Sequence, residues 1–186
     1  ERVAIAVLVA AVLLVVGLGA VPTTAEATTV GQCHEINESV VPANRTVVLD
    51  ENVGTSSSTC LTVTASNVTV DGQGNAITGP GLSASGGGGV VVENASAQTN
   101  VTVRNLTVEN FQNGIVVTDA TDVTVRNVVV DGNVKSGTGV STNGGASDLV
   151  LRDSAVANHS SAVRVGGPNT TVENLTAVGG STGVRV

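Results

Sequence analysis

Residues 99–120, TNVTVRNLTVENFQNGIVVTDA, contain the pattern that the rest of the chain repeats. When Asn100 is aligned with Asp122, Asp148 and Asn169, four blocks superimpose: NVTVRNLTV, DVTVRNVVV, DLVLRDSAV and NTTVENLTA. A looser copy, NVTVDGQGNAI, begins at Asn67, and successive copies start 33, 22, 26 and 21 residues apart. A period of this length is typical of a solenoid, in which stacked repeats share one core because a single repeat cannot bury its apolar face alone.

Each block alternates with a period of two, which indicates a β-strand rather than a helix. The third position of the blocks is mostly Thr, a β-branched residue that suits an exposed strand position. A second strand-like piece, such as Gly114-Ile-Val-Val, follows in each copy, so a coil of about 22 residues is expected to hold three short strands and three bends. The second and fourth positions are expected to form two interior columns: Val68, Val101, Val123, Leu149 and, as an exception, Thr170, then Val70, Val103, Val125, Leu151 and Val172.

The sixth position of each block is polar or glycine. It reads Gly72, Asn105, Asn127, Asp153 and Asn174. Asn tolerates the left-handed backbone of a corner, and its amide can bond to the same amide one rung away. The sequence therefore predicts an amide ladder along this corner, placed on the inner side of the coil.

The motif NVT(V/I)xN…G(I/V)xV resembles the repeats of NosD-type proteins in the pectate-lyase-like superfamily of right-handed parallel β-helices. The resemblance covers about residues 60–186. It implies an all-β fold, a single-stranded right-handed parallel β-helix. It implies little about function, since this fold serves lyases, hydrolases, adhesins and surface proteins alike.

Residues 1–27 have the features of an export signal. Arg2 precedes an apolar run over residues 3–19, and Ala25-Glu26-Ala27 offers a small-x-small cleavage site. An uncleaved membrane anchor is the alternative, because a run of this length is just able to span a bilayer. Either reading predicts a signal helix and a protein that is secreted or displayed at the cell surface.

Residues 28–60 do not follow the repeat and contain both cysteines, Cys33 and Cys60. Two cysteines in an exported protein most often pair. We expect this segment to form a disulfide-bonded N-terminal cap, in which ESVVPANRTVVLDENV contributes one or two strands over the first rung, because an open first rung invites edge pairing with other chains. A metal site at Cys33, His34 and Cys60 is the rival reading, but it lacks a second ligand cluster. Residues 61–186 are expected to hold the coils, which are expected to continue beyond Val186.

The chain has 15 acidic and 8 basic residues and a net charge of −7, with a single Lys, one Phe and no Trp or Tyr. An acidic, Lys-poor surface keeps a protein hydrated in concentrated salt, and in this respect the chain resembles secreted proteins of haloarchaea. The same charge argues against nucleic acid or anionic membranes as partners. Contact with a membrane is expected only through the N-terminal segment or a C-terminal anchor beyond Val186.

Nine Asn residues occur in N-x-S/T sequons, and the repeat itself explains five of them. The four that lie outside the repeat columns are the glycosylation candidates of an exported protein: Asn37, Asn44, Asn94 and Asn158.

The fifth position of the blocks forms one outward column with rungs about 4.8 Å apart. It reads Asp71, Arg104, Arg126, Arg152 and Glu173. Stacked guanidinium groups could bind the carboxylates or sulfates of an acidic polysaccharide. The alternative is a solvated face on which the Arg side chains merely cover their neighbours.

No catalytic constellation is found. Glu109 and Asp131 share one offset in adjacent coils and could hold a cation or share a proton, although two surface acids are the simpler reading. No Ser/His/Asp set, phosphate loop or zinc spacing appears. No cofactor is expected; calcium is the one cation left open, and no ligand cluster supports it.

We therefore expect an exported, non-catalytic β-helix scaffold that binds polysaccharide or a cell-surface glycan. The first alternative is a polysaccharide lyase or glycoside hydrolase whose catalytic coils lie outside this sequence. The second is an accessory protein for metalloenzyme maturation, which the NosD-type resemblance implies.

Overall fold

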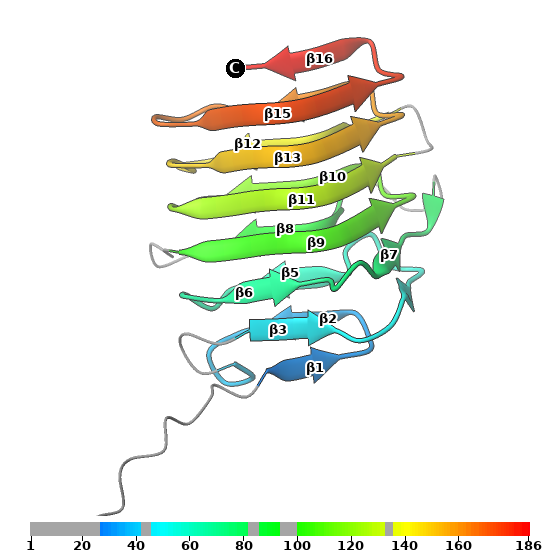
Figure 1. The fold of residues 1–186 in the computed structure, drawn as a ribbon, viewed down its shortest axis with the longest axis vertical. Coiled ribbons are helices and arrows are strands. Elements are labelled where there is room, and N and C mark those ends of the chain that lie inside the picture. Colours follow the sequence, from blue (N-terminus) through cyan, green and yellow to red (C-terminus); the bar gives the residue numbers. More distant parts are fainter. Residues whose placement is uncertain (1–26, 42–45, 82–85, 94–99, 133–135) are drawn as a thin grey trace, which may run out of the picture.

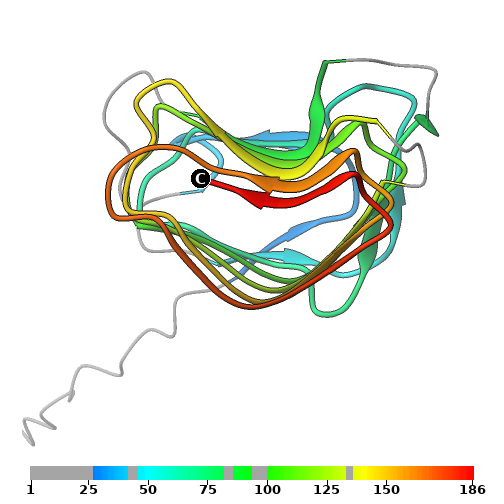
Figure 2. The ribbon, with the colours of Figure 1, turned by 90° about the horizontal axis from the view of Figure 1, so that it is seen from above.

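The long strands of the repeat stack directly on one another in the computed structural model, which describes residues 27–41, 46–81, 86–93, 100–132 and 136–186 (Figure 1). Two parallel sheets wind around one interior, and seen from above the coils superimpose (Figure 2). In the described residues the sixteen strands are β1 (Thr28–Val30), β2 (His34–Ile36), β3 (Thr46–Leu49), β4 (Val53–Gly54), β5 (Leu61–Val63), β6 (Thr69–Asp71), β7 (Ala76–Thr78), β8 (Gly88–Glu93), β9 (Val101–Glu109), β10 (Asn113–Thr118), β11 (Val123–Asp131), β12 (Thr138–Asn143), β13 (Val150–Ala157), β14 (Ser161–Arg164), β15 (Thr171–Val178) and β16 (Thr182–Arg185).

The first sheet contains the long strands of the repeat, in the order β1-β3-β6-β9-β11-β13-β15, with β4 paired to β7 and β7 also to β9. The second sheet has the order β16-β14-β12-β10-β8-β5-β2. Every strand pair in the described residues is parallel, and each long strand pairs with the long strand of the next coil rather than with its neighbour in the sequence. This is the parallel β-solenoid that the repeat predicted.

The interior columns are confirmed. Val103 pairs with Val125, and both side chains have an exposed fraction of 0%. The same column continues through Val70 and Leu151, which are also 0% exposed. A core of this kind needs side chains that fit rung on rung, and it consists mainly of Val, Leu, Ile and Ala with one aromatic residue, Phe111.

The corners of the coil are made by Asn and Asp residues with a left-handed backbone. Asn100 and Asp122 open their blocks at φ 63° and 53°, and Asn105 and Asn127 bend the long strands at φ 52° and 51°. Asn and Asp adopt this conformation at lower cost than other residues with a side chain. The coil of β5, β6 and β7 has the expected three short strands, whereas from β8 onward a coil has one short strand and one long strand, such as β9, that continues through its bend at Asn105.

Residues 28–60, which were expected to act as a cap, also contribute strands to both sheets. Thr46 of β3 pairs with Thr69 of β6, and His34 of β2 pairs with Leu61 of β5. The segment thus continues the solenoid register toward the N-terminus, although its sequence lacks the repeat motif.

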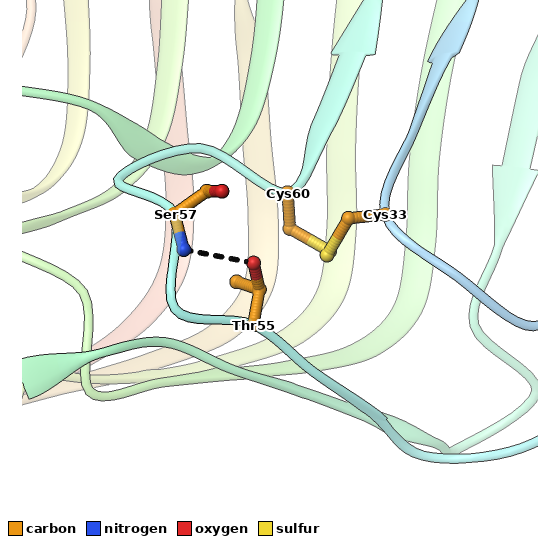
Figure 3. Close-up of a disulfide and its surroundings, with 4 residues drawn as sticks. All are labelled: Cys33, Thr55, Ser57 and Cys60. Atoms are coloured by element: carbon orange, nitrogen blue, oxygen red, sulfur yellow. Dashed lines mark hydrogen bonds between the residues drawn. A yellow bond between two sulfur atoms is a disulfide. The ribbon is translucent and has the colours of Figure 1, made fainter.

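The predicted disulfide is confirmed. Cys33 and Cys60 are bonded, with their Cα atoms 4.4 Å apart (Figure 3). The bond joins β2 to the start of β5 one rung away, where the His34 amide also donates to the Cys60 carbonyl oxygen at 3.0 Å. Disulfides are typical of proteins that leave the reducing cytoplasm. The cysteines therefore staple two coils together, and the rival metal site at Cys33, His34 and Cys60 is wrong because both thiols are consumed.

The predicted signal helix falls in residues 1–26, which lie outside the described part of the chain. Among the residues that are described, no helix has the length and apolar character needed to cross a bilayer.

Candidate functional site

The arginine column predicted from the sequence is present in the structure. Arg104 of β9 pairs in register with Arg126 of β11, and Arg126 with Arg152 of β13. Asp71 of β6 precedes Arg104, and Glu173 of β15 follows Arg152. Period-two alternation places these side chains on the outer face of the first sheet, because the residue before each arginine, such as Val103 before Arg104, points into the core. We call these five residues the arginine column.

Asp71 closes the N-terminal end of the arginine column. Its Oδ2 accepts a hydrogen bond from Nε of Arg104 at 2.8 Å, and its Oδ1 accepts from Nδ2 of Asn105 and from the Gln73 amide, each at 3.0 Å. Burial raises the pKa of Asp71, but the hydrogen bonds from Gln73 and Asn105 and the charge of Arg104 outweigh this effect and hold the pKa below its usual value. The charge of Arg104 is therefore matched by a close carboxylate.

Arg152 also has a carboxylate nearby, whereas Arg126 does not. Arg152 Nη1 lies 3.4 Å from Oδ2 of Asp153, and both side chains are about half exposed, which makes this a weak ion pair. Within the described part of the chain, no carboxylate oxygen lies within 4.0 Å of Arg126. Arg126 is thus the central cation of the arginine column and the one without a partner charge there.

The predicted amide ladder is confirmed, but its position on the inner side of the coil was wrong. Nδ2 of Asn105 donates to Asp71, Nδ2 of Asn127 donates to Oδ1 of Asn105 at 2.7 Å, and Nδ2 of Asn174 donates to Oδ1 of Asp153 at 2.8 Å. Asn127, Asp153 and Asn174 are exposed and Asn105 is half-buried. The apolar residues on both sides of the bend take the interior, so the corner amides remain at the surface.

The ladder is interrupted between Asn127 and Asp153. Each Asn donates to the residue one rung toward the N-terminus, but the Asp153 carboxylate has no hydrogen to donate. In the described residues no donor reaches Oδ1 of Asn127. The amide oxygen of Asn127 and the carboxylate of Asp153 are therefore both acceptors, and no ladder bond joins these two rungs.

Asp153→Asn is expected to raise the free energy of unfolding by about 1 kcal/mol, because the new amide can donate to Asn127 and still accept from Asn174. The left-handed backbone at φ 53° tolerates the change, and the exposed contact with Arg152 that is lost contributes little. Urea unfolding at constant m-value measures the effect. Asp153→Gly, which keeps the backbone conformation but offers no amide, is the control; equal stability of the two variants would rule out the ladder bond.

Two depressions run along the ladder corner beside the arginine column. The larger, of about 490 Å³, is lined by Asp71, Gln73, Asn105, Thr107, Asn127 and Val129, together with Gly74 and Leu106. The smaller, of about 260 Å³, continues on the C-terminal side and is lined in part by Asn127, Val129, Asp153 and Asn174. Asn127 and Val129 belong to both, so the two depressions meet at the rung of Arg126.

The acidic pair predicted from the offsets is also in register, since Asp131 of β11 pairs with Glu109 of β9. Oδ1 of Asp131 accepts a hydrogen bond from Nδ2 of Asn158 at 2.9 Å, so this carboxylate is held by a side chain of the next coil. In the described residues no group of three His, Cys, Asp or Glu side chains is placed to hold a metal ion.

His159, which stands alone in the sequence, is buried behind this pair. Its side chain is 2% exposed, Nδ1 donates to the carbonyl oxygen of Ala157 at 3.0 Å, and no group of the described residues bonds to Nε2. The ring fits because Gly132 lacks a side chain that would occupy its space. Burial lowers the pKa of His159 below its usual value, although the Ala157 bond, the nearby Phe111 backbone and the Asp131 charge favour the protonated ring.

Acid is therefore expected to destabilise the fold through His159. A depressed folded-state pKa means that the neutral ring contributes stability above the unfolded pKa of about 6.5 and that this contribution is lost as the pH falls below it. His159→Phe, which places the residue type of Phe111 at an equivalent corner, should flatten the pH dependence of the unfolding midpoint below that pH. His34→Phe, at an exposed position, is the control; an unchanged pH profile in His159→Phe would contradict the assignment.

Of the glycosylation candidates, Asn44 and Asn94 lie outside the described residues. Asn37 is half-buried and its Oδ1 accepts from the amides of Ser39 and Val40, while Asn158 is half-buried and bonded to Asp131. Modification at Asn37 and Asn158 stays a prediction.

Sequence reasoning missed two parts of this site. The sequence showed that Arg104 and Asp71 occupy the same position of adjacent repeats, but it did not show that their side chains form an ion pair. The larger depression depends on the turn at Gln73 and Gly74, which separates β6 from β7, whereas β9 and β11 continue through their bends.

A comparison with protein-family models matches residues 40–186 to the right-handed β-helix region. A search of curated proteins finds no match. Among solved structures, the chain is similar to a putative glycosyl hydrolase from Parabacteroides merdae, with a TM-score of 0.59, 15% sequence identity and coverage of 81% of this chain and 78% of that one. At this identity the likeness concerns the fold alone. Because the family model spans most of the chain and the structure shows the same parallel coils, the chain belongs to the right-handed β-helix family.

Proposed function

We propose that the protein is an exported, non-catalytic β-helix scaffold of the cell surface or extracellular space that binds acidic glycans at the arginine column. The observation that carries this proposal is the register of Arg104, Arg126 and Arg152 on three adjacent rungs. Guanidinium groups bind carboxylates and sulfates through paired hydrogen bonds, and a rigid sheet holds them at a fixed spacing. The disulfide between Cys33 and Cys60 supports export.

The partner is a polysaccharide or cell-surface glycan rather than a nucleic acid, because the net charge of −7 opposes most strongly a backbone that carries a negative charge on every unit. The fold similarity to a putative glycosyl hydrolase is compatible with a carbohydrate-related role. Cofactors are not required for binding of this kind.

The purified protein is expected to be retained on immobilised alginate, pectin or sulfated glycan and to leave the polymer length unchanged. Arg126→Ala should weaken binding roughly tenfold to a hundredfold, the range for loss of hydrogen bonds to a charged group. Affinity electrophoresis in gels containing each glycan measures the change. Arg164→Ala removes an exposed arginine of β14 in the other sheet and should leave binding unaltered.

Equal retention of the Arg126→Ala and Arg164→Ala variants would refute the arginine column as the binding site. Shortened polymers or unsaturated products would instead support the lyase or hydrolase alternative.

A further inference from the structure

The charges of the arginine column and of Asp153 beside it cancel. Its three arginines are accompanied by Asp71 and Glu173 within the column and by Asp153 at the adjacent corner, so the sum is three positive minus three negative charges, or zero. The whole chain carries a net charge of −7. The face therefore has no excess positive charge to attract a densely charged polyanion from a distance.

The cancellation is uneven along the column. Arg104 is bonded to Asp71 and Arg152 lies beside Asp153, whereas the described residues place no carboxylate against Arg126. A ligand anion that binds Arg126 does not have to compete with a carboxylate of the protein for the guanidinium group. A second anion one rung away, about 4.8 Å along the axis, would meet an arginine that already has a carboxylate next to it.

The ladder corner that follows Arg126 in β11 suits uncharged groups, while Arg126 itself lines neither depression. The two depressions that meet at its rung present the amides of Asn105 and Asn127, the hydroxyl of Thr107 and the apolar side chain of Val129, which is 46% exposed. Amides and hydroxyls exchange hydrogen bonds with sugar hydroxyls, and an exposed Val offers contact to the C–H face of a sugar ring.

We propose that the site selects glycans whose acidic groups are isolated: one carboxylate or sulfate binds Arg126, and neutral sugar units lie along the ladder corner on both sides. This inference rests on the proposed glycan-binding function and names its ligand class. Asp71 and Asp153 are specificity determinants, because they occupy the arginines that a fully charged chain would need.

The test compares two probes of equal length, a hyaluronan octasaccharide, in which every second unit carries a carboxylate, and an octagalacturonate, in which every unit does. Calorimetry at fixed ionic strength is expected to show about tenfold tighter binding of the hyaluronan probe to the unmodified protein. The double variant Asp71→Asn with Asp153→Asn should bind the octagalacturonate about tenfold more tightly than the unmodified protein does, because Arg104 and Arg152 are released.

The control is the double variant Asp122→Asn with Asp148→Asn, which changes the net charge equally at corners on the other side of the long strands. It should leave the preference for hyaluronan unchanged. The inference is overturned if the octagalacturonate binds more tightly to the unmodified protein, or if Arg104→Ala and Arg152→Ala weaken hyaluronan binding as much as Arg126→Ala. Binding of neither probe would instead overturn the glycan-binding function itself.

Discussion

Gly114→Ala is expected to lower the free energy of unfolding by about 3 kcal/mol or more, the upper range for overpacking a filled interior. Gly114 stands at the start of β10, in register between Gly89 and Gly139 of the adjacent coils. A methyl group there would overlap Cγ1 of Val130 and lie 2.5 Å from the carbonyl oxygen of Gly139. The backbone carbonyl belongs to the sheet and has little freedom to move, so the coils would have to separate.

Gly183→Ala is a matched control, because Gly183 occupies the same column one rung beyond Ala162 and nothing lies within 4 Å of an added methyl group. Urea unfolding followed by circular dichroism should show a large fall in the midpoint for Gly114→Ala and little change for Gly183→Ala. Similar midpoints for the two variants would mean that the coils adapt at this corner, contrary to the geometry.

Loss of the disulfide is expected to be the second large effect. Cys33 and Cys60 are separated by 27 residues, and in the chain-entropy model the cross-link of a loop of this size contributes about 3–4 kcal/mol. Because each coil of a solenoid contacts only its neighbours, the loss should be concentrated in the N-terminal coils. Hydrogen exchange should therefore accelerate most at the amides of β2 and β5 in the Cys33→Ala, Cys60→Ala double variant.

Reduced wild-type protein provides the comparison, since it lacks the bond but retains both side chains. It should exchange like the double variant in β2 and β5 and like the oxidised protein in β11 and β13. Uniform acceleration through all strands would contradict local action of the disulfide, and unchanged exchange would show that the bond does not stabilise these coils.

Much of the fold was predictable because two features of the repeat indicate it. One is the alternation of apolar and polar residues, and the other is the Asn and Asp residues at the corners. Val103 and Val125 were expected in one column from their offsets, and Asn105 and Asn127 were expected to bond across one rung, and both expectations are confirmed. The continuation of both sheets into residues 28–60 was not predicted. Thr46 and His34 pair in register with strands of the next coil through backbone hydrogen bonds, and such bonds do not require the side chains of the repeat motif.

The candidate site was predicted only in outline. The offsets correctly placed Arg104, Arg126 and Arg152 in one column, but they say nothing about which arginine is already bonded. That distinction arises because the Asp71 side chain reaches one rung to Arg104, and because Asp153 follows Arg152 directly in the chain. The position of the ladder was misjudged since alternation alone does not show to which side a left-handed residue directs its side chain.

The corner between the long and short strands differs in length from coil to coil. β9 and β10 are joined by residues 110–112, whereas β7 and β8 are joined by residues 79–87 and β11 and β12 by residues 132–137. The strands on either side keep their register despite these differences. The chain can thus lengthen at this corner without altering the stack, and it is here that peptide epitopes or recognition loops could be grafted at successive heights on one rigid support.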